Sequence, residues 1–308
     1  MKSVRFALFL TCGALLATTP AFTQSEANSG QGRAVVTVLA KHNEVAPAIA
    51  QPDVSAKVNG KEAEITAWAP FKSPNDNLEL VILIDSGARN LGRQMDEITH
   101  FILNLEPHTK VAVGYMQNGY SAMEGPLTAD HAQVAKLVHL PAGPLTNPYF
   151  ALSDLAHKWP SQDPSARREV VMFTDGIDPE NRRFDPDDPY VQAAIRDSVR
   201  AGLVVYNIYW RSFPTNPNSM TAEGGQSLLE EITQATGGNS YWLGSGNPVT
   251  FQPYFEDLMR RFDSQYALDF AAKLDRKPSV DTFKLKLEGL NLQVTAPQQV
   301  FVHPGLRP

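Results

Sequence analysis

The chain has 308 residues but a single cysteine, Cys12, so no disulfide can form within it and the fold must be held by its core. Blocks of Lys and Arg interleaved with aromatic residues are also missing, and the formal net charge is −6. This balance disfavours nucleic-acid binding. Apart from the extreme N-terminus there is no long apolar run, so we expect no transmembrane segment in the mature chain. A hydrophobic share of 43% and a charged share of 19% are typical of a globular protein.

The N-terminus has the pattern of a secretory signal peptide. Cations precede an apolar stretch at residues 6–17, which is too short to span a bilayer, and small residues follow it. We expect cleavage after Ala21 or Thr23, which predicts a secreted or periplasmic protein. The alternative is a lipoprotein signal with Cys12 as the lipidated residue, but the apolar stretch before this residue is short, and lipid anchoring is therefore disfavoured.

Hydrophobic patterns divide the chain into four parts: a signal peptide (1–23), a flexible N-terminus with a small β element (24–77), an α/β domain (78–262) and a C-terminal β segment (263–308). In the α/β domain, continuous apolar runs alternate with apolar residues at helical spacing. This order favours a doubly wound, mostly parallel sheet with helices on both faces. The flanking segments alternate apolar and polar residues, which predicts antiparallel strands, and we expect these two segments to pack together.

Two of the apolar runs in the α/β domain end in an aspartate. Residues 80–84 lead into Asp85, and residues 170–174 lead into Asp175. In an open parallel sheet, ligands bind where the strands end. We therefore expect the two carboxylates to face one pocket. The alternative is that each aspartate only caps backbone donors near it.

The order of these residues resembles the metal-ion-dependent adhesion site of the von Willebrand factor A (vWA) family. That site is built from Asp-x-Ser-x-Ser, a distant Thr and a distant Asp. The resemblance places Asp85 at the first aspartate, Thr146 at the threonine and Asp175 at the last aspartate, whereas the two serine positions hold Gly87 and Arg89.

The departures from the pattern change the expected chemistry. A guanidinium keeps its proton and cannot bind a metal, so Arg89 could replace the ion by pairing with Asp85 and Asp175. If Arg89 points away instead, Ser86 and water could complete a weak site for Mg²⁺ or another divalent cation. The sequence therefore predicts a degenerate site whose metal dependence is weakened or lost.

The resemblance extends beyond the α/β domain. A secreted chain with a β segment carrying an Asn-Gly turn, then a vWA-type domain, then a β tail that begins with tyrosine is similar to the VWFA-related acidobacterial domain family. This resemblance implies a bacterial protein with a vWA-type fold, and of the two functional classes that remain we favour a non-catalytic binding module. The Asn-Gly turn is Asn59-Gly60, a strong hairpin signal.

A binding module would present the rim of its sheet, including loops near 117–126 and 176–190, to an unknown protein or glycan partner. The apolar anchors expected on this rim are Tyr115, Met116, Tyr120, Met123 and Tyr149. We expect the acidic residues of the loop near 176–190 to be solvated. After this loop, a helix is predicted over residues 192–201.

The alternative function is an Asp-based phosphoester hydrolase with Asp85 as nucleophile. Haloacid dehalogenase-like phosphatases also have an aspartate at the end of their first strand. They need a second acid two residues later to protonate the leaving group, and here that position is Gly87. We therefore expect no enzymatic activity.

Overall fold

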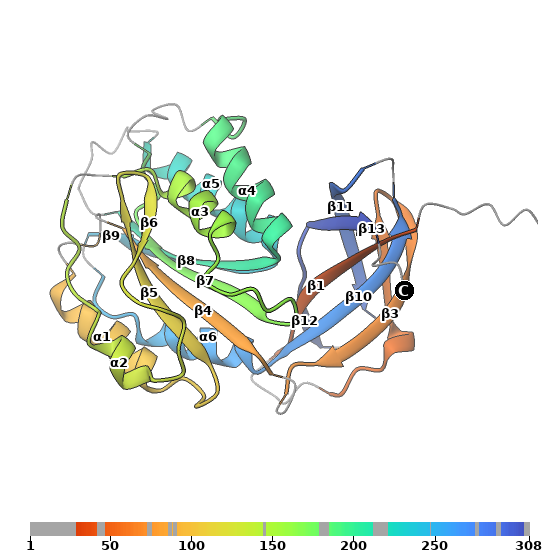
Figure 1. The fold of residues 1–308 in the computed structure, drawn as a ribbon, viewed down its shortest axis with the longest axis horizontal. Coiled ribbons are helices and arrows are strands. Elements are labelled where there is room, and N and C mark those ends of the chain that lie inside the picture. The colour runs from red at the N-terminus through yellow and green to blue at the C-terminus, as the bar shows by residue number, and fades with distance from the viewer. Residues whose placement is uncertain are drawn as a thin grey trace, which may run out of the picture.

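The protein forms two units that lie side by side, an α/β unit and a β-barrel (Figure 1). The computed structural model describes residues 29–41, 47–72, 76–85, 88, 91–143, 146–178, 185–211, 221–246, 248–274, 277–287 and 291–304. The predicted signal peptide and Cys12 lie outside these residues. Within the described part, no helix is both long enough and apolar enough to cross a membrane.

The α/β unit contains a six-stranded sheet with the order β6-β5-β4-β7-β8-β9. The pairings among β5, β4, β7, β8 and β9 are parallel, and β6 is added antiparallel at the edge. The predicted mixed α/β class is therefore confirmed. The strands are β4 (Leu78–Ile84), β5 (Lys110–Gln117), β6 (Tyr120–Met123), β7 (Arg167–Thr174), β8 (Leu203–Arg211) and β9 (Ser240–Ser245).

Helices cover both faces of this sheet, because successive side chains of a strand point to opposite faces. Leu80 and Ile82 of β4 pack in one core with α1 and α6, whereas Val81 and Leu83 pack in another core with α3, α4 and α5. The helices are α1 (Gly92–Leu103), α2 (His131–Ala135), α3 (Pro148–His157), α4 (Pro189–Ala201), α5 (Thr221–Thr236) and α6 (Gln252–Phe262).

The second unit is built from both ends of the described chain. Its strands follow the order β10-β3-β2-β11-β13-β1-β12, and a further pairing of β1 with β10 closes the sheet into a barrel. All of its pairings for which a register is known are antiparallel. Its elements are β1 (Ser29–Ala40), the 3-10 helix η2 (Gln51–Asp53), β2 (Val54–Val58), β3 (Lys61–Pro70), β10 (Gln265–Lys273), β11 (Ser279–Leu287), β12 (Leu292–Thr295) and β13 (Gln299–Pro304).

The two flanking segments do pack together, but the N-terminal one is not a separate β element. β1 pairs with β10, β12 and β13, so the strand is shared with the C-terminal segment. The chain leaves the barrel after β3 and returns to it at β10. These two strands are paired, with Pro70 opposite Tyr266. The entry and exit of the α/β unit are therefore neighbours.

A buried polar cluster lies where the two units meet. Arg167, at the start of β7, is 2% exposed. Its guanidinium donates to Asp76 Oδ1 at 2.7 Å, to the carbonyl of Phe262 at 2.8 Å and to the side chain of Gln265. Glu169 is fully buried beside it, with Oε1 3.6 Å from Arg167 Nη1. One arginine thus connects the sheet, the segment before β4 and the turn into the barrel.

Glu169 is expected to make the stability of the protein depend on pH. Burial raises the pKa of its carboxyl from 4.5 to about 7, and the charge of Arg167 only partly opposes the shift. Neither carboxylate oxygen has a hydrogen-bond partner among the described residues. The folded state therefore favours the protonated form. This contribution to stability is complete below the unfolded pKa and is lost as the pH rises through the folded pKa.

We expect Glu169→Gln, which mimics the protonated carboxyl, to be more stable than the unchanged chain at pH 8, by about 3 kcal/mol at most. The two proteins should have nearly equal stability at pH 4. Urea unfolding followed across this pH range measures the difference. An equal decline of both proteins between pH 4.5 and 7 would show that Glu169 does not titrate in this window.

Candidate functional site at the carboxyl edge of the sheet

The structure brings Asp85 and Asp175 together at the carboxyl edge of the sheet. Asp85 follows β4 and Asp175 follows β7, its neighbour in the sheet. Both are buried, at 2% and 4% exposure. Burial, and then the nearby charge of Asp85, raises the pKa of Asp175 to about 7. Two carboxylates in one buried place repel each other, so this edge favours a cation.

Both carboxylates already accept hydrogen bonds from the protein. Thr174 Oγ1 donates to Asp85 Oδ2 at 2.6 Å, and the backbone amide of Ile177 donates to Asp175 Oδ1 at 3.0 Å. Thr174 is the last residue of β7 and was not among the site residues predicted from the sequence. Its signal was its position next to Asp175.

Thr146 lies in the loop before α3 and is 4% exposed. Its Oγ1 accepts a hydrogen bond from the backbone amide of Gly119 at 2.7 Å. Gly119 and Asn118 both have positive φ, at 79° and 50°, in the turn that joins β5 to β6. Thr146 therefore holds the β5–β6 hairpin against the start of α3.

A third carboxylate, Asp178, also lies in this buried region. Asp178 is 2% exposed and accepts a hydrogen bond from Asn147 Nδ2 at 2.6 Å, so it is not the solvated residue that we expected. Asn147 also caps α3, because its Oδ1 accepts from the amide of Phe150 at 2.8 Å. The loop after β7 is thereby attached to the loop before α3.

Tyr149 joins the same cluster from the first turn of α3. Its hydroxyl donates to the carbonyl of Gly176 at 2.9 Å. Burial raises the pKa of Tyr149 well above its ordinary value, and the charges of Asp178, Asp175 and Asp85 raise it further. Tyr149 thus remains a neutral hydrogen-bond donor within an acidic site.

The donor set fits a cation in part. Two buried carboxylates and a hydroxyl are present, in the order of the adhesion-site pattern, but Ser86, Gly87 and Arg89 lie outside the described residues. Among the described residues, no group of three or more His, Cys, Asp or Glu side chains is arranged to hold a metal ion. The adhesion-site pattern itself needs only two carboxylates, since hydroxyls and water complete it.

Three of the five expected rim anchors are core residues instead. Tyr115, Met116 and Tyr149 are at most 1% exposed. The hydroxyl of Tyr115 donates to the carbonyl of His139 at 2.8 Å, and Met116 packs in the core under α3. Only Tyr120, which is 51% exposed, and the half-buried Met123 reach the surface.

An exposed aromatic row extends from Tyr120. Its ring lies 5.5 Å from that of Phe150, and the ring of Phe150 lies 5.5 Å from that of Tyr190, which is 41% exposed. Tyr120 begins β6, and the other two rings come from the first turns of α3 and α4. We name these three residues the aromatic row. It lies beside Thr146, at the carboxyl edge of the sheet.

Comparisons with known proteins give likeness in structure only. No protein-family model and no curated protein sequence matches the chain. Solved structures similar to it include BatB from Bacteroides thetaiotaomicron, at 13% identity over 60% of this chain and 96% of that one, with a TM-score of 0.43. At this level of identity and TM-score, such likenesses carry no argument about what the chain binds.

Two further similar structures are the VWA domain of SpRpn10 and the pilus adhesin SpaC from Lactobacillus rhamnosus GG. The first is 12% identical over 54% of this chain and 87% of that one, with a TM-score of 0.37. The second is 10% identical over 82% of this chain and 48% of that one, with a TM-score of 0.47. The strand order and pairing of the chain itself therefore define its fold.

Proposed function

We propose that the protein is a secreted, non-catalytic binding module. Its α/β unit would be a doubly wound vWA-like domain that presents the carboxyl edge of the sheet to a protein or glycan partner. Metal dependence at that edge would be weakened or lost. Secretion is proposed from the signal-peptide pattern of residues 1–23.

The aromatic row is the observation that carries the binding role. Tyrosine side chains offer large contact areas at small entropic cost and are enriched among the residues that dominate binding energy. Here Tyr120 and Tyr190 remain exposed on rigid elements, and Phe150 supports both rings. Lys158 adds a cation 5.4 Å from the ring of Tyr120. A partner docked on this row would also cover the acidic cluster.

The weakened metal dependence is supported by the acidic cluster and by the sequence. Asp85, Asp175 and Thr146 each accept a hydrogen bond from the protein. The positions of the two family serines are Gly87 and Arg89, and Arg89 supplies a permanent cation next to the site in sequence. When bound, a divalent ion would draw on these carboxylates and on the Thr146 hydroxyl. We propose that Arg89 neutralises the carboxylates instead.

The non-catalytic role is supported by the environment of Asp85. A nucleophilic carboxylate needs access to the substrate, but Asp85 is 2% exposed and accepts a short hydrogen bond from Thr174. The position expected to hold a general acid is Gly87. Turnover of p-nitrophenyl phosphate that Asp85→Asn abolishes would contradict this part of the proposal.

The binding role is tested with the double variant Tyr120→Ala/Tyr190→Ala. We expect it to lose at least tenfold in affinity for any glycan or surface protein that the unchanged chain binds on arrays, because both exposed anchors are removed. The matched control is Leu103→Ala, which removes an exposed apolar side chain from the far end of α1 and should leave the affinity unchanged. If the double variant and the unchanged chain bind with equal affinity, the binding surface does not include the aromatic row.

A further inference from the structure

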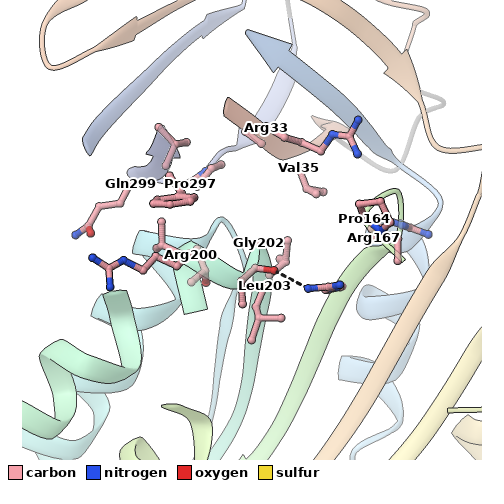
Figure 2. A pocket seen from close by; sticks show the side chains of 18 of the residues that line it. Arg33, Val35, Pro164, Arg167, Arg200, Gly202, Leu203, Pro297 and Gln299 are labelled. Carbon is pink, nitrogen blue, oxygen red and sulfur yellow. Dashed lines mark hydrogen bonds between the residues drawn. The ribbon is translucent and has the colours of Figure 1, made fainter. Parts of the chain in front are cut away.

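A pocket of about 320 Å³ lies between the barrel and the α/β unit, far from the carboxyl edge. Figure 2 shows Arg33, Val35, Pro297 and Gln299 of the barrel facing Arg200, Gly202 and Leu203 of the α/β unit. These α/β residues come from the end of α4 and the start of β8. Its volume lies within the range of small-molecule sites, which often form at boundaries between domains.

The charge of this interdomain pocket is unusual for an acidic protein. Four arginines line it, together with His303, and no aspartate or glutamate does. Two of the arginines are neutralised from outside the pocket, because Arg33 pairs with Asp269 at 2.6 Å and Arg167 pairs with Asp76 at 2.7 Å. The remaining two, Arg168 and Arg200, have no carboxylate partner among the described residues.

The protein compensates only part of this charge. Arg168 donates to the carbonyls of Ser161, Asp163 and Ala201, at 3.2 to 3.4 Å. Ala201 ends α4, and a helix C-terminus carries about half a negative elementary charge. The full charge of Arg168 lies against this half charge, and Arg200 adds a second guanidinium on the other side of the pocket (Figure 2). The balance in the pocket is therefore positive, and an anion is the species that would be stabilised there.

The remaining walls are apolar. Val35 and Phe301 contribute them from the barrel, and Leu203 and Pro164 from the α/β unit. A bare inorganic anion would leave these walls without a contact. A ligand with an anionic group at one end and an apolar body would satisfy both the charge and the walls.

From this arrangement we propose that the interdomain pocket binds a small organic anion. The anionic group pairs with Arg168 beside the end of α4, and the apolar body lies against Val35, Phe301 and Leu203. Because the ligand contacts both units, its binding energy stabilises their association as well as the fold. This site is independent of the partner surface proposed above, since none of its residues belongs to the aromatic row.

The probe for this proposal is 4-phenylbutyrate, titrated into the full chain by calorimetry at low salt, with the neutral 4-phenylbutyramide as its matched control. We expect the carboxylate to bind and the amide to bind at least tenfold more weakly. Arg168→Gln should weaken binding of the carboxylate about tenfold, since it removes the cation that pairs with the anionic group. Arg93→Gln, which removes an exposed arginine from α1, should leave the affinity unchanged.

A second variant, Val35→Trp, fills the pocket from β1 without changing its charge, and we expect it to abolish binding while thermal unfolding confirms that it folds. Three results would overturn the proposal: no binding of 4-phenylbutyrate up to about 10 mM, equal affinity for the amide, or equal weakening by Arg168→Gln and Arg93→Gln. Undiminished binding by a folded Val35→Trp protein would also overturn it.

Discussion

The double variant Gly87→Ser/Arg89→Ser is expected to bind Mg²⁺ or Mn²⁺ under conditions in which the unchanged chain shows no binding. The two substitutions restore both hydroxyls of the adhesion-site pattern and remove the permanent cation. What remains is a pair of buried carboxylates, Asp85 and Asp175. Burial, and then the charge of Asp85, already raises the pKa of Asp175. A bound divalent ion would relieve the repulsion between these carboxylates directly.

The expected gain in affinity is at least 100-fold. A guanidinium within about 5 Å of a cation site opposes each unit of ion charge by about 3 kcal/mol at an effective dielectric constant of about 20. Even if the opposing energy is only half of this value, its removal raises the affinity about tenfold for each unit of ion charge. Calorimetric titration with MnCl₂ measures the gain, and the rise in melting temperature with added MnCl₂ reports it independently.

Two controls separate the roles of the substitutions. Gly87→Ser alone adds a hydroxyl but keeps Arg89, and it should not bind the ion. The double variant combined with Asp85→Ala should lose the binding again. Micromolar binding of Mg²⁺ by the unchanged chain, lost in Asp85→Ala, would refute the proposal that metal dependence is weakened.

Arg167→Met is expected to destabilise the protein by about 3–5 kcal/mol, since removal of one member of a buried ion pair leaves an uncompensated charge. Here Asp76 and Glu169 both lose their cation, and the carbonyl of Phe262 loses its donor. The midpoint of urea unfolding at pH 7, followed by tryptophan fluorescence, measures the loss.

The neighbouring Arg168→Met is the matched control for this prediction. Arg168 is half-buried and bonds only to backbone carbonyls among the described residues, so its removal should cost about 1 kcal/mol. Adding Glu169→Gln to Arg167→Met should recover part of the lost stability, because a buried glutamine, unlike the buried carboxyl, does not have to take up a proton at pH 7. A loss below about 1 kcal/mol for Arg167→Met would mean that the cluster does not hold the units together.

The α/β unit was predictable because its signals are local. The run 80–84 is apolar at every position, as a strand between two helix layers requires, and its residues do divide between two cores. The aspartates at the ends of two such strands could be paired in advance, since neighbouring parallel strands end at one edge. The closure of the barrel was not predictable in this way, because β1 pairs with β10, and these two strands are far apart in the sequence.

The surface of the site was harder to predict than its acidic centre. Asn118-Gly119 carries the same turn signal as Asn59-Gly60, yet the predicted feature at this place was a loop and not the β5–β6 hairpin. The helix predicted from residue 192 begins at Pro189, where Asp188 caps it by accepting from the amide of Tyr190 at 2.8 Å. That shift puts Tyr190 in the aromatic row.

Burial of the expected anchors had a different cause. Tyr115 and Met116 lie near the end of β5. A tyrosine or methionine side chain at such a position can be buried in the core or exposed at the surface. Their exposure depends on whether α3 and residues 137–139 cover them, which is a matter of tertiary packing. No local pattern distinguishes the two outcomes.

The adjacency of Pro70 and Tyr266 makes the α/β unit an insertion between two paired strands of the barrel. The register of the barrel does not depend on how many residues separate these two positions, because the chain returns to the place it left. The unit that carries the acidic cluster can therefore change in length, or be exchanged for another, while the barrel keeps its pairings. The inserted unit can therefore diversify in evolution while the barrel stays the same scaffold.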